Sequence, residues 1–330
     1  MPRRTLRRWA LLALALLALI GAAAGGALLA WHETQRRYTA PGPLPADTAV
    51  VIPRGGALDI ARALQAQGVI GSADAFRLAA ALTASAGPLH AAEFLFPAHA
   101  SLRETLAILR SARPVQHRIT LPEGLTAAQI AMLLDREEAL SGDTPIPGEG
   151  ELLADTYGFE RGTARSAIAD RAAAAMRRTL ARIWAERDPA IPLKSPHDLL
   201  TLASIVERET ARPEERPHVA AVFYNRLNRA MRLQSDPTVI YAATGGARTG
   251  GHSITRAELD TDHPYNTYRI RGLPPAPIAT PGAASLLATA HPIPSDDLFF
   301  VAAPTGGHSF ARTLEEHNRN VASWLAAQPR

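Results

Sequence analysis

The sequence predicts an α+β protein with three parts: an N-terminal transmembrane helix, a small α+β module, and a mostly helical C-terminal domain with a small sheet. Three observations support this order. An uncharged apolar run lies near the N-terminus, strand-like and helical patterns alternate over 48–115, and a series of helix-start signals follows residue 164. With 47% apolar residues among 330, the chain can bury the cores of about two domains.

The predicted transmembrane helix runs from Trp9 to Trp31, a stretch in which every residue is apolar or glycine. A helix of this length spans about 35 Å, which is enough to cross a hydrocarbon core of about 30 Å. Tryptophans at both ends are typical of membrane interfaces. Because four arginines lie within residues 1–8, the positive-inside rule predicts a cytoplasmic N-terminal tail and a single pass through the membrane.

The alternative is a cleaved signal peptide, since Ala22-Ala23-Ala24 resembles a cleavage site. Signal peptides have an apolar core of about 7–15 residues, however, and the run here is longer. The length therefore favours a retained anchor, with the rest of the chain outside the cytoplasm.

Charge and composition exclude several classes of protein. The net charge of +4 comes from 35 basic and 31 acidic residues, and the four tail arginines account for the whole excess. A neutral body offers no field for phosphates, so no nucleic-acid partner is expected. The absence of cysteine excludes disulfides and thiolate chemistry. The 11 histidines form no i, i+3 or i, i+4 pair, so neither a metal nor a cofactor is expected.

After a Pro- and Gly-containing linker over 32–47, the order strand–helix–helix–strand–helix predicts a small α+β module over 48–115. Its expected elements are a strand from residue 48, helices over 57–67 and 72–86, a strand over 92–96 and a helix over 102–110.

The C-terminal domain, 116–330, is expected to be mostly helical. Its expected helices are 127–135, 164–185, 199–211, 214–227, 236–243, 280–290 and one opening at residue 313, with strands over 117–121, 268–271 and 298–302 and a loop over 140–151. The clearest helix start is Ser195-Pro196-His197-Asp198, which has a Ser N-cap, Pro at the first helical position and an acid three residues after the cap.

Glu209 has an unusual place on the helix that follows. At about 100° per residue, Leu202, Ile205 and Val206 form an apolar stripe that includes Glu209, whereas Glu207 lies on its flank. Burial disfavours an ionised carboxylate and raises its pKa, as a general acid near neutral pH requires. The spacing equally allows Glu209 to be the polar end of the stripe, bonded to a neighbouring helix.

Amide, hydroxyl and tyrosine side chains gather in two short segments, 225–238 and 265–275. Such side chains suit carbohydrate, because sugar hydroxyls need donors and acceptors while sugar ring faces need apolar platforms. The alternative is structural: Asp236 and Thr267 cap helices, and the prolines fix turns.

These segments closely resemble the YceG-like (MltG) family of endolytic murein transglycosylases, in the family's order over residues 48–325. The matching segments are LASIVERET at 202–210, VFYNRL at 222–227, MRLQSDPTVIY at 231–241, YNTY at 265–268, GLPP at 272–275, IATPG at 278–282, GGH at 306–308 and EHN at 316–318. The chain departs from the family at Leu153-Ala154-Asp155-Thr156-Tyr157, where relatives carry Phe-Pro-Asp-Thr-Tyr. It also has Ala92-Glu93-Phe94 where Gly-x-Tyr is expected.

The resemblance implies a LysM-like module at 48–115 and a catalytic domain at 116–330, anchored in the inner (plasma) membrane of the cell envelope. It implies cleavage of the bond between N-acetylmuramic acid and N-acetylglucosamine in nascent peptidoglycan glycan strands, leaving 1,6-anhydro ends and limiting strand elongation, in the company of peptidoglycan synthases. The Glu before Thr in the family's Glu-x-Glu-Thr motif is the catalytic acid/base, and here it is Glu209.

The residues expected to bind or frame the glycan come from the two polar segments. They are Asn225, Gln234, Ser235, Asp236, Tyr265, Asn266 and Tyr268. Of these, Gln234, Asn266 and Tyr268 are expected to hold the sugars, while Asn225 and Tyr265 are expected to shape the helix and the loop.

Two alternative functions stay open. One is a non-catalytic peptidoglycan-binding scaffold. The other is a muramidase that uses water, which needs a second carboxylate about 5–10 Å from the acid; Asp236 and Glu207 are the nearby candidates by motif. For the 48–115 module, the alternatives are glycan docking and a spacer.

Overall fold

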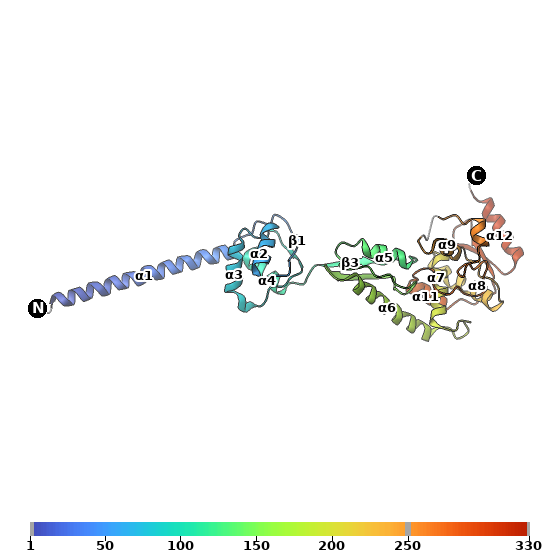
Figure 1. The fold of residues 1–330 in the computed structure, drawn as a ribbon, viewed down its shortest axis with the longest axis horizontal. Helices are drawn as coiled ribbons and strands as arrows, with labels where there is room; N and C mark the ends of the chain where they lie inside the picture. Colours follow the sequence, from blue (N-terminus) through green and yellow to red (C-terminus); the bar gives the residue numbers. More distant parts are fainter. Residues whose placement is uncertain (1–2, 248–251, 329–330) are drawn as a thin grey trace. The chain divides into compact units, whose positions relative to one another are not determined.

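The computed structural model describes residues 3–247 and 252–328, and the chain divides into two compact units. The first unit ends at Gln116 and the second begins at His117 (Figure 1). Each unit has its own buried cores, so each is described by itself.

The first unit opens with helix α1, Arg3–Thr39. By length and composition, the stretch Leu14–Thr39 could cross a membrane, and its leucines are more than half exposed. The helix continues eight residues beyond Trp31, so residues 32–39 are helical rather than part of the expected linker. No proline or glycine follows until Pro41, and Glu33 pairs with Arg37 one turn later at 2.8 Å, which stabilises a continued helix.

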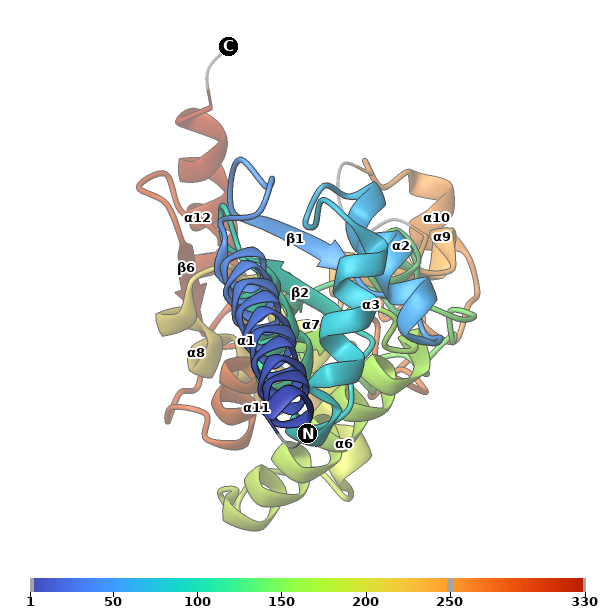
Figure 2. The same ribbon diagram turned by 90° about the vertical axis from the view of Figure 1, so that its left-hand side faces the viewer.

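The 48–115 module is an α+β unit, as expected. Its elements are β1 Thr48–Val51, α2 Ala57–Ala66, α3 Ala73–Leu82, the 3-10 turn η1 Ala84–Ala86, β2 Glu93–Phe96 and α4 Leu102–Ser111. Strands β1 and β2 pair antiparallel, and α2 packs on α3 beside them (Figure 2). Phe76, Phe94 and Leu106 are buried in the shared core. The expected helix over 72–86 therefore ends early, at Leu82, and a separate turn follows.

The second unit begins with strand β3, which pairs with β4, and with two helices that pack on them. The bounds are β3 Gln116–Thr120, α5 Ala127–Asp135, β4 Thr156–Glu160 and α6 Arg165–Glu186. Strand β4 was not predicted from the sequence. Only Phe159 of its five residues is buried, so the strand carries little of the apolar alternation by which strands are recognised.

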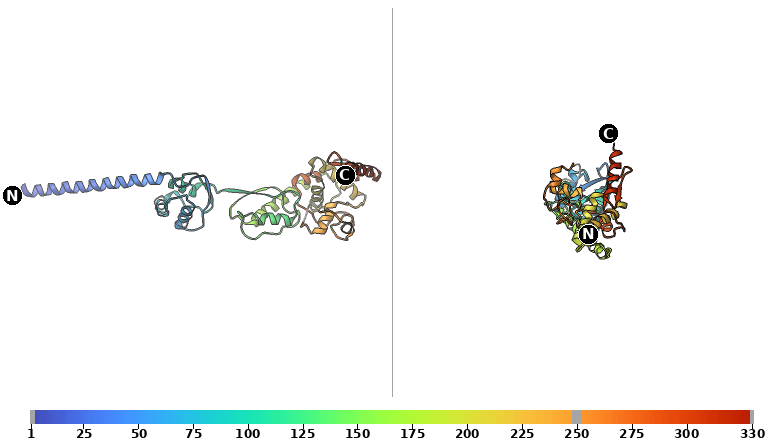
Figure 3. Two further views of the ribbon diagram at one scale, coloured as in Figure 1. Left: turned by 90° about the horizontal axis from the view of Figure 1, so that it is seen from above. Right: turned by 90° about the vertical axis from the view of Figure 1, so that its right-hand side faces the viewer.

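The rest of the second unit is built around helix α7, Pro196–Glu209, in which residues 199–206 are all buried. Helices α6, α8, α9 and α11 pack against it (Figure 1). The bounds after α7 are η2 Pro213–Glu215, α8 Arg216–Asn228, α9 Asp236–Thr244, α10 Arg256–Asp260, α11 Ala283–Ala290, β5 Phe299–Ala302, β6 His308–Ala311 and α12 Leu314–Ala326. Strands β5 and β6 pair antiparallel and contact α12, which is red in Figure 3.

The expected strand over Tyr268–Arg271 is wrong, because these residues form consecutive turns. The backbone carbonyl of Asn266 accepts hydrogen bonds from the amides of Arg269 and Ile270, which bends the chain where a strand would be extended. Two short elements, α10 and β6, were not predicted, and α11 begins at Ala283 rather than at residue 280.

Candidate active site

Helix α7 delivers Glu209 to its C-terminal end. At the other end, Ser195 and Asp198 form a reciprocal capping box and Pro196 occupies the first turn, as the sequence predicts. The helix stops at Glu209, and the amide of the C-cap residue Thr210 donates to the carbonyl of Val206. The carboxyl of Glu209 therefore lies where the central helix ends and other elements converge.

Glu209 lines a cavity of about 180 Å³. The other lining residues are Arg226, Leu233, Gln234, Asp236, Tyr268 and Phe300. Helices α7, α8 and α9, strand β5 and the loops around them each contribute a side chain. Polar groups thus converge from segments far apart in the sequence, as they do in ligand-binding and active sites.

The surroundings of Glu209 favour its neutral form. The pKa of the Glu209 carboxyl is raised to about 7, chiefly by burial and to a smaller extent by the nearby Asp236 carboxylate. The hydroxyl of Ser235 donates to Oε1 of Glu209 and, with Arg226 and Arg208, opposes that rise. A carboxyl that titrates near 7 can give a proton and take one back at physiological pH.

Arg226, on α8, lines the cavity and holds two backbone segments beside it. It is buried, its Nε donates to the carbonyl of Leu298 at 2.6 Å, and its Nη1 donates to the carbonyl of Leu233 at 2.7 Å. Nη1 also lies 3.5 Å from Oε1 of Gln234, which leaves the Nε2 hydrogens of that amide to bind a ligand. Neither Arg226 nor Phe300 was predicted as a site residue; Phe300 lies in an all-apolar strand that gave no such signal.

The first two side chains at the N-terminus of α9 bond residues of the cavity instead of capping the helix. Ser235 holds the N-cap position, but its side chain makes no cap hydrogen bond and instead bonds Glu209. Asp236 is the first helical residue, and its Oδ1 accepts from the Tyr268 hydroxyl at 2.6 Å. The interpretation of Asp236 as a helix cap is therefore wrong. An unused cap forgoes about 1 kcal/mol of helix stability.

Gln234 has a left-handed backbone, with φ of 51°. Such a conformation costs about 1–3 kcal/mol in a residue with a side chain and is held only by its surroundings. Here the backbone N–H of Gln234 donates to the carbonyl of Thr267 at 3.2 Å, and the backbone N–H of Ser235 donates to the Thr267 hydroxyl at 2.9 Å. The Thr238 hydroxyl completes this buried network at 2.8 Å from the Thr267 hydroxyl. This network therefore holds the backbone of Gln234 in its left-handed conformation beside the cavity.

Four of the expected binding residues lie outside the cavity lining: Ser235, described above, and Asn225, Tyr265 and Asn266. Asn266 is fully buried, and its Nδ2 lies within 3.1 Å of the carbonyls of Glu258, Leu259 and Thr261. It is therefore a loop-shaping residue, contrary to its expected role in holding a sugar. Asn225 and Tyr265 were expected to shape the helix and the loop. The Asn225 side chain donates to the carbonyls of Ser295 and Asp297, and the Tyr265 ring packs on Tyr241.

Glu207, the other carboxylate at this end of α7, has a structural role. Its side chain is 6% exposed, lies 3.0 Å from Nη2 of Arg216, and accepts a hydrogen bond from the amide of Gly282 at 3.0 Å. It therefore ties α7 to α8 and to the segment before α11. In the part of the chain that the structure describes, no group of three or more His, Cys, Asp or Glu side chains is placed to hold a metal ion.

Fold and site together define a class of protein with an N-terminal apolar helix, a small α+β module, and a helical domain in which a buried carboxyl meets polar side chains in a small cavity. Comparison with known proteins identifies the class. The chain belongs to the YceG-like family, whose family model matches residues 50–323.

Curated relatives and a solved structure agree with this assignment. The chain is 43% identical over 136 residues to the endolytic murein transglycosylase of Bacillus subtilis (strain 168), which covers 41% of this chain and 36% of that protein. It is 33% identical over 256 residues to the endolytic murein transglycosylase of Streptococcus pneumoniae serotype 2, covering 63% and 45% respectively. The chain thus matches less than half the length of these relatives.

The solved structure is of a putative yceG-like protein from Listeria monocytogenes, which is 30% identical to this chain. The TM-score is 0.52, and the match covers 83% of this chain and 99% of that one. The solved structure therefore supports the fold over most of the chain.

Proposed function

We propose that this protein is a membrane-anchored lytic transglycosylase that cleaves the β-1,4 bond between N-acetylmuramic acid and N-acetylglucosamine within nascent peptidoglycan strands, leaves 1,6-anhydro ends and limits strand elongation. The observation that carries the proposal is Glu209, whose pKa burial raises to about 7 in a cavity of polar side chains. Both curated relatives are named endolytic murein transglycosylases, which supports the same substrate.

In this mechanism Glu209 acts twice. As a neutral acid it protonates the glycosidic oxygen while positive charge develops at the muramoyl ring. The carboxylate then takes the proton from the C6 hydroxyl of the same sugar, whose oxygen closes onto C1. The bond to N-acetylglucosamine breaks, a C6–O–C1 bond forms, and Glu209 returns to its neutral form. Because the nucleophile belongs to the substrate, neither water nor a second catalytic carboxylate is required.

The other side chains of the cavity divide the remaining tasks. Ser235 holds Oε1 of Glu209, so Oε2 is the oxygen that exchanges the proton. Gln234 and Tyr268 bind sugar hydroxyls, with Asp236 orienting the Tyr268 hydroxyl. Phe300 offers an apolar face to a sugar ring. Ser235 is thus a positioning residue rather than a glycan ligand.

Asp236 gives one alternative a physical basis. It is the second carboxylate lining the cavity, so a hydrolase in which Asp236 activates water is the competing mechanism. Its hydrogen bond to Tyr268 favours an orienting role instead. A non-catalytic scaffold is the remaining alternative, and the raised pKa of Glu209 argues against it because glycan binding alone does not need a carboxyl that titrates near 7.

The proposed cellular arrangement follows from the first unit. Helix α1 anchors the chain in the inner membrane by a single pass, with residues 1–8 in the cytoplasm and the module and catalytic domain outside it. The uncharged run of α1 and the arginines before it support this topology. The 48–115 module is LysM-like and docks on glycan, and peptidoglycan synthases supply the nascent strands.

The experiment that tests the activity is product analysis. Purified full-length protein in detergent is incubated with purified glycan strands, and the products are examined by mass spectrometry. New 1,6-anhydro ends that arise from cuts within the strands support the proposal. New reducing ends indicate the hydrolase, and uncut strands that remain bound to the protein indicate the scaffold.

A further inference from the structure

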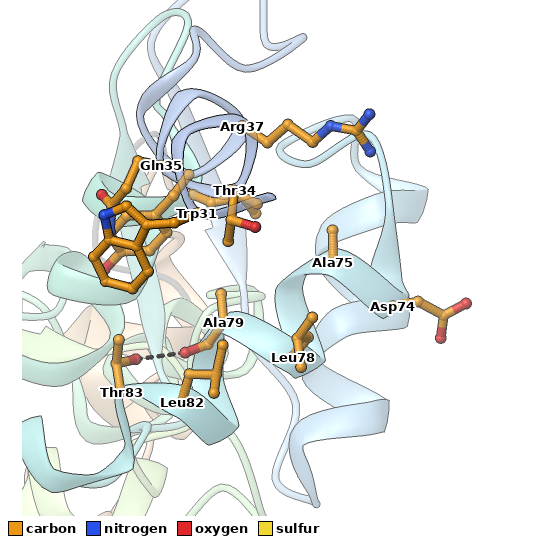
Figure 4. Close-up of a pocket in the computed structure, with 12 residues that line it drawn as sticks. Trp31, Thr34, Gln35, Arg37, Asp74, Ala75, Leu78, Ala79, Leu82 and Thr83 are labelled. Atoms are coloured by element: carbon orange, nitrogen blue, oxygen red, sulfur yellow. Dashed lines mark hydrogen bonds between the residues drawn. The ribbon is translucent and has the colours of Figure 1, made fainter. Parts of the chain in front are cut away.

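An apolar groove of about 600 Å³ lies between the last turns of α1 and helix α3 of the module. Its apolar walls are Trp31 and Tyr38 from α1, Leu78 and Leu82 from α3, and Leu102 from α4. Figure 4 shows the Trp31 side chain on the side of α1 that faces Leu82 and Thr83.

Helix α3 is apolar on two faces, but the module's core uses only one. Phe76 and Ala80 are buried in that core, whereas Leu78 is 59% exposed and Leu82 is 69% exposed. Leu78 and Leu82 are four residues apart and so lie on one side of the helix. A paired apolar surface of this kind at a groove is typical of an interaction site.

Several polar side chains at the edge of the groove are already bonded, among them Thr83 and Arg37. The Thr83 hydroxyl donates to the carbonyl of Ala79 at 2.6 Å, which is the dashed line in Figure 4, and it accepts from Nη2 of Arg110 at 2.9 Å. The Arg37 side chain is paired with Glu33 at 2.8 Å. The groove therefore offers mainly apolar contact and few of the donors and acceptors that a sugar needs.

The position of the groove along α1 identifies its occupant. The uncharged run ends at Trp31, and the groove uses α1 residues from Trp31 to Tyr38. At about 1.5 Å per residue, that segment covers roughly the first 10 Å beyond the hydrocarbon core, which is the headgroup layer of a bilayer. Trp31, at the end of the uncharged run, is a residue type that is enriched at the membrane interface.

We propose that the Leu78–Leu82 face of α3 rests in the headgroup–acyl boundary of the membrane that holds α1, with phospholipid acyl chains entering the groove. This inference rests on the proposed membrane anchor. It means that the module lies on the bilayer surface rather than standing away from it, so that glycan is engaged close to the membrane where strands are made.

The test uses full-length protein in vesicles of phosphatidylethanolamine and phosphatidylglycerol. Because the chain contains no cysteine, Leu82→Cys creates a single site for an environment-sensitive fluorophore. Leu95→Cys is the matched control, since Leu95 is 56% exposed on β2 of the same module and is not a groove residue. Carbonate extraction of the same vesicles reports separately whether α1 is inserted. Thermal unfolding in detergent checks that both variants fold like the parent.

With α1 inserted, we expect the probe at 82 to emit at shorter wavelength and to be quenched by shallow spin-labelled lipid several-fold more than the probe at 95. Equal, water-like emission from both probes with α1 inserted would overturn this inference and leave the anchor intact. Loss of the protein on carbonate extraction would overturn the anchor and the inference together. A wavelength shift that vanishes when the protein is diluted into excess lipid would place a second copy in the groove, and would also overturn the proposal.

Discussion

Glu207 and Glu209 are two residues apart on α7, but one forms an ion pair and the other lines a cavity. Glu207 is locked to Arg216, whereas Glu209 faces a cavity and bonds Ser235. The helical spacing in the sequence already separates them, because the side on which a residue lies depends only on its position in the helix. The sequence could not show that Arg226, from the next helix, lies close to Glu209, because that proximity depends on tertiary packing.

Replacing Glu209 tests its role at the residue scale. Glu209→Gln preserves size and hydrogen bonding but cannot deliver a proton, so we expect the rate per folded molecule to fall about 10²–10⁴-fold. The measurement is initial rate on glycan strands, with circular dichroism to count folded protein.

Glu207→Gln is the matched control. It removes the nearer of two carboxylates paired with the buried Arg216, while Glu123 remains 3.6 Å away. We therefore expect a loss of about 1.5–3 kcal/mol of stability but a far smaller loss of rate per folded molecule than in Glu209→Gln. Parent-like activity in Glu209→Gln, or loss of activity in the Glu207 variant alone, would be incompatible with the assignment.

The raised pKa of Glu209 also predicts how stability depends on pH. The folded state binds a proton more tightly than the unfolded state between the ordinary value of 4.5 and about 7. The free energy of unfolding therefore falls as pH rises through that window, by about 3 kcal/mol at most. Above about pH 7 the ionised Glu209 lowers the stability of the folded state by this full amount.

Glu209→Gln removes the loss of stability that comes from ionising Glu209. Urea unfolding of the second unit should show the variant gaining on the parent as pH rises from about 4 to about 8. A difference between the two proteins that does not change with pH would show that Glu209 titrates normally.

At the scale of elements, strong capping signals predicted helices well. Ser195 opens α7 and Thr313 opens α12 at the expected residues, because a cap is a local interaction. The turns over Tyr268–Arg271 were not predicted. They depend on backbone hydrogen bonds to the carbonyl of Asn266, and the pattern of residue types does not reveal these bonds. Asn266 itself looked like a sugar ligand, since sequence does not tell a buried amide from an exposed one.

The N-terminus of α9 supplies a prediction about positioning. Ser235→Ala removes the hydrogen bond that opposes the rise in the pKa of Glu209, so the alkaline limb of the pH–rate profile should move to higher pH. Loss of orientation should lower kcat about 10-fold with little change in KM, and helix stability should change little because the Ser235 side chain caps nothing.

Asn266→Ala is the comparison variant for this experiment. It leaves three carbonyls without their donor and should lower stability without moving the pH limb. If Ser235→Ala left the limb in place, Ser235 would have only a structural role.

At the scale of the whole molecule, the chain has an N-terminal apolar helix, then an α+β set of elements, then mostly helices with short strands. The end of α1 was placed too early, because the apolar run stops at Trp31 while helix-compatible residues continue to Thr39. Charge and hydropathy report where a membrane segment ends, whereas proline and glycine report where a helix ends.

The two units have separate cores, so the module can be removed. We expect a chain lacking residues 48–115 to keep the fold of the second unit, measured by near-ultraviolet circular dichroism. It should sediment less with insoluble peptidoglycan than the full chain does. Unchanged sedimentation with an intact second unit would show that the module is a spacer.

The central claim is that Glu209 cuts glycan without using water, and cleavage in water enriched in oxygen-18 tests it most directly. Parent protein should give new 1,6-anhydro ends that carry no label, and Glu209→Gln should give almost none. New muramoyl reducing ends labelled with oxygen-18, in place of anhydro ends, would contradict the claim and establish hydrolysis.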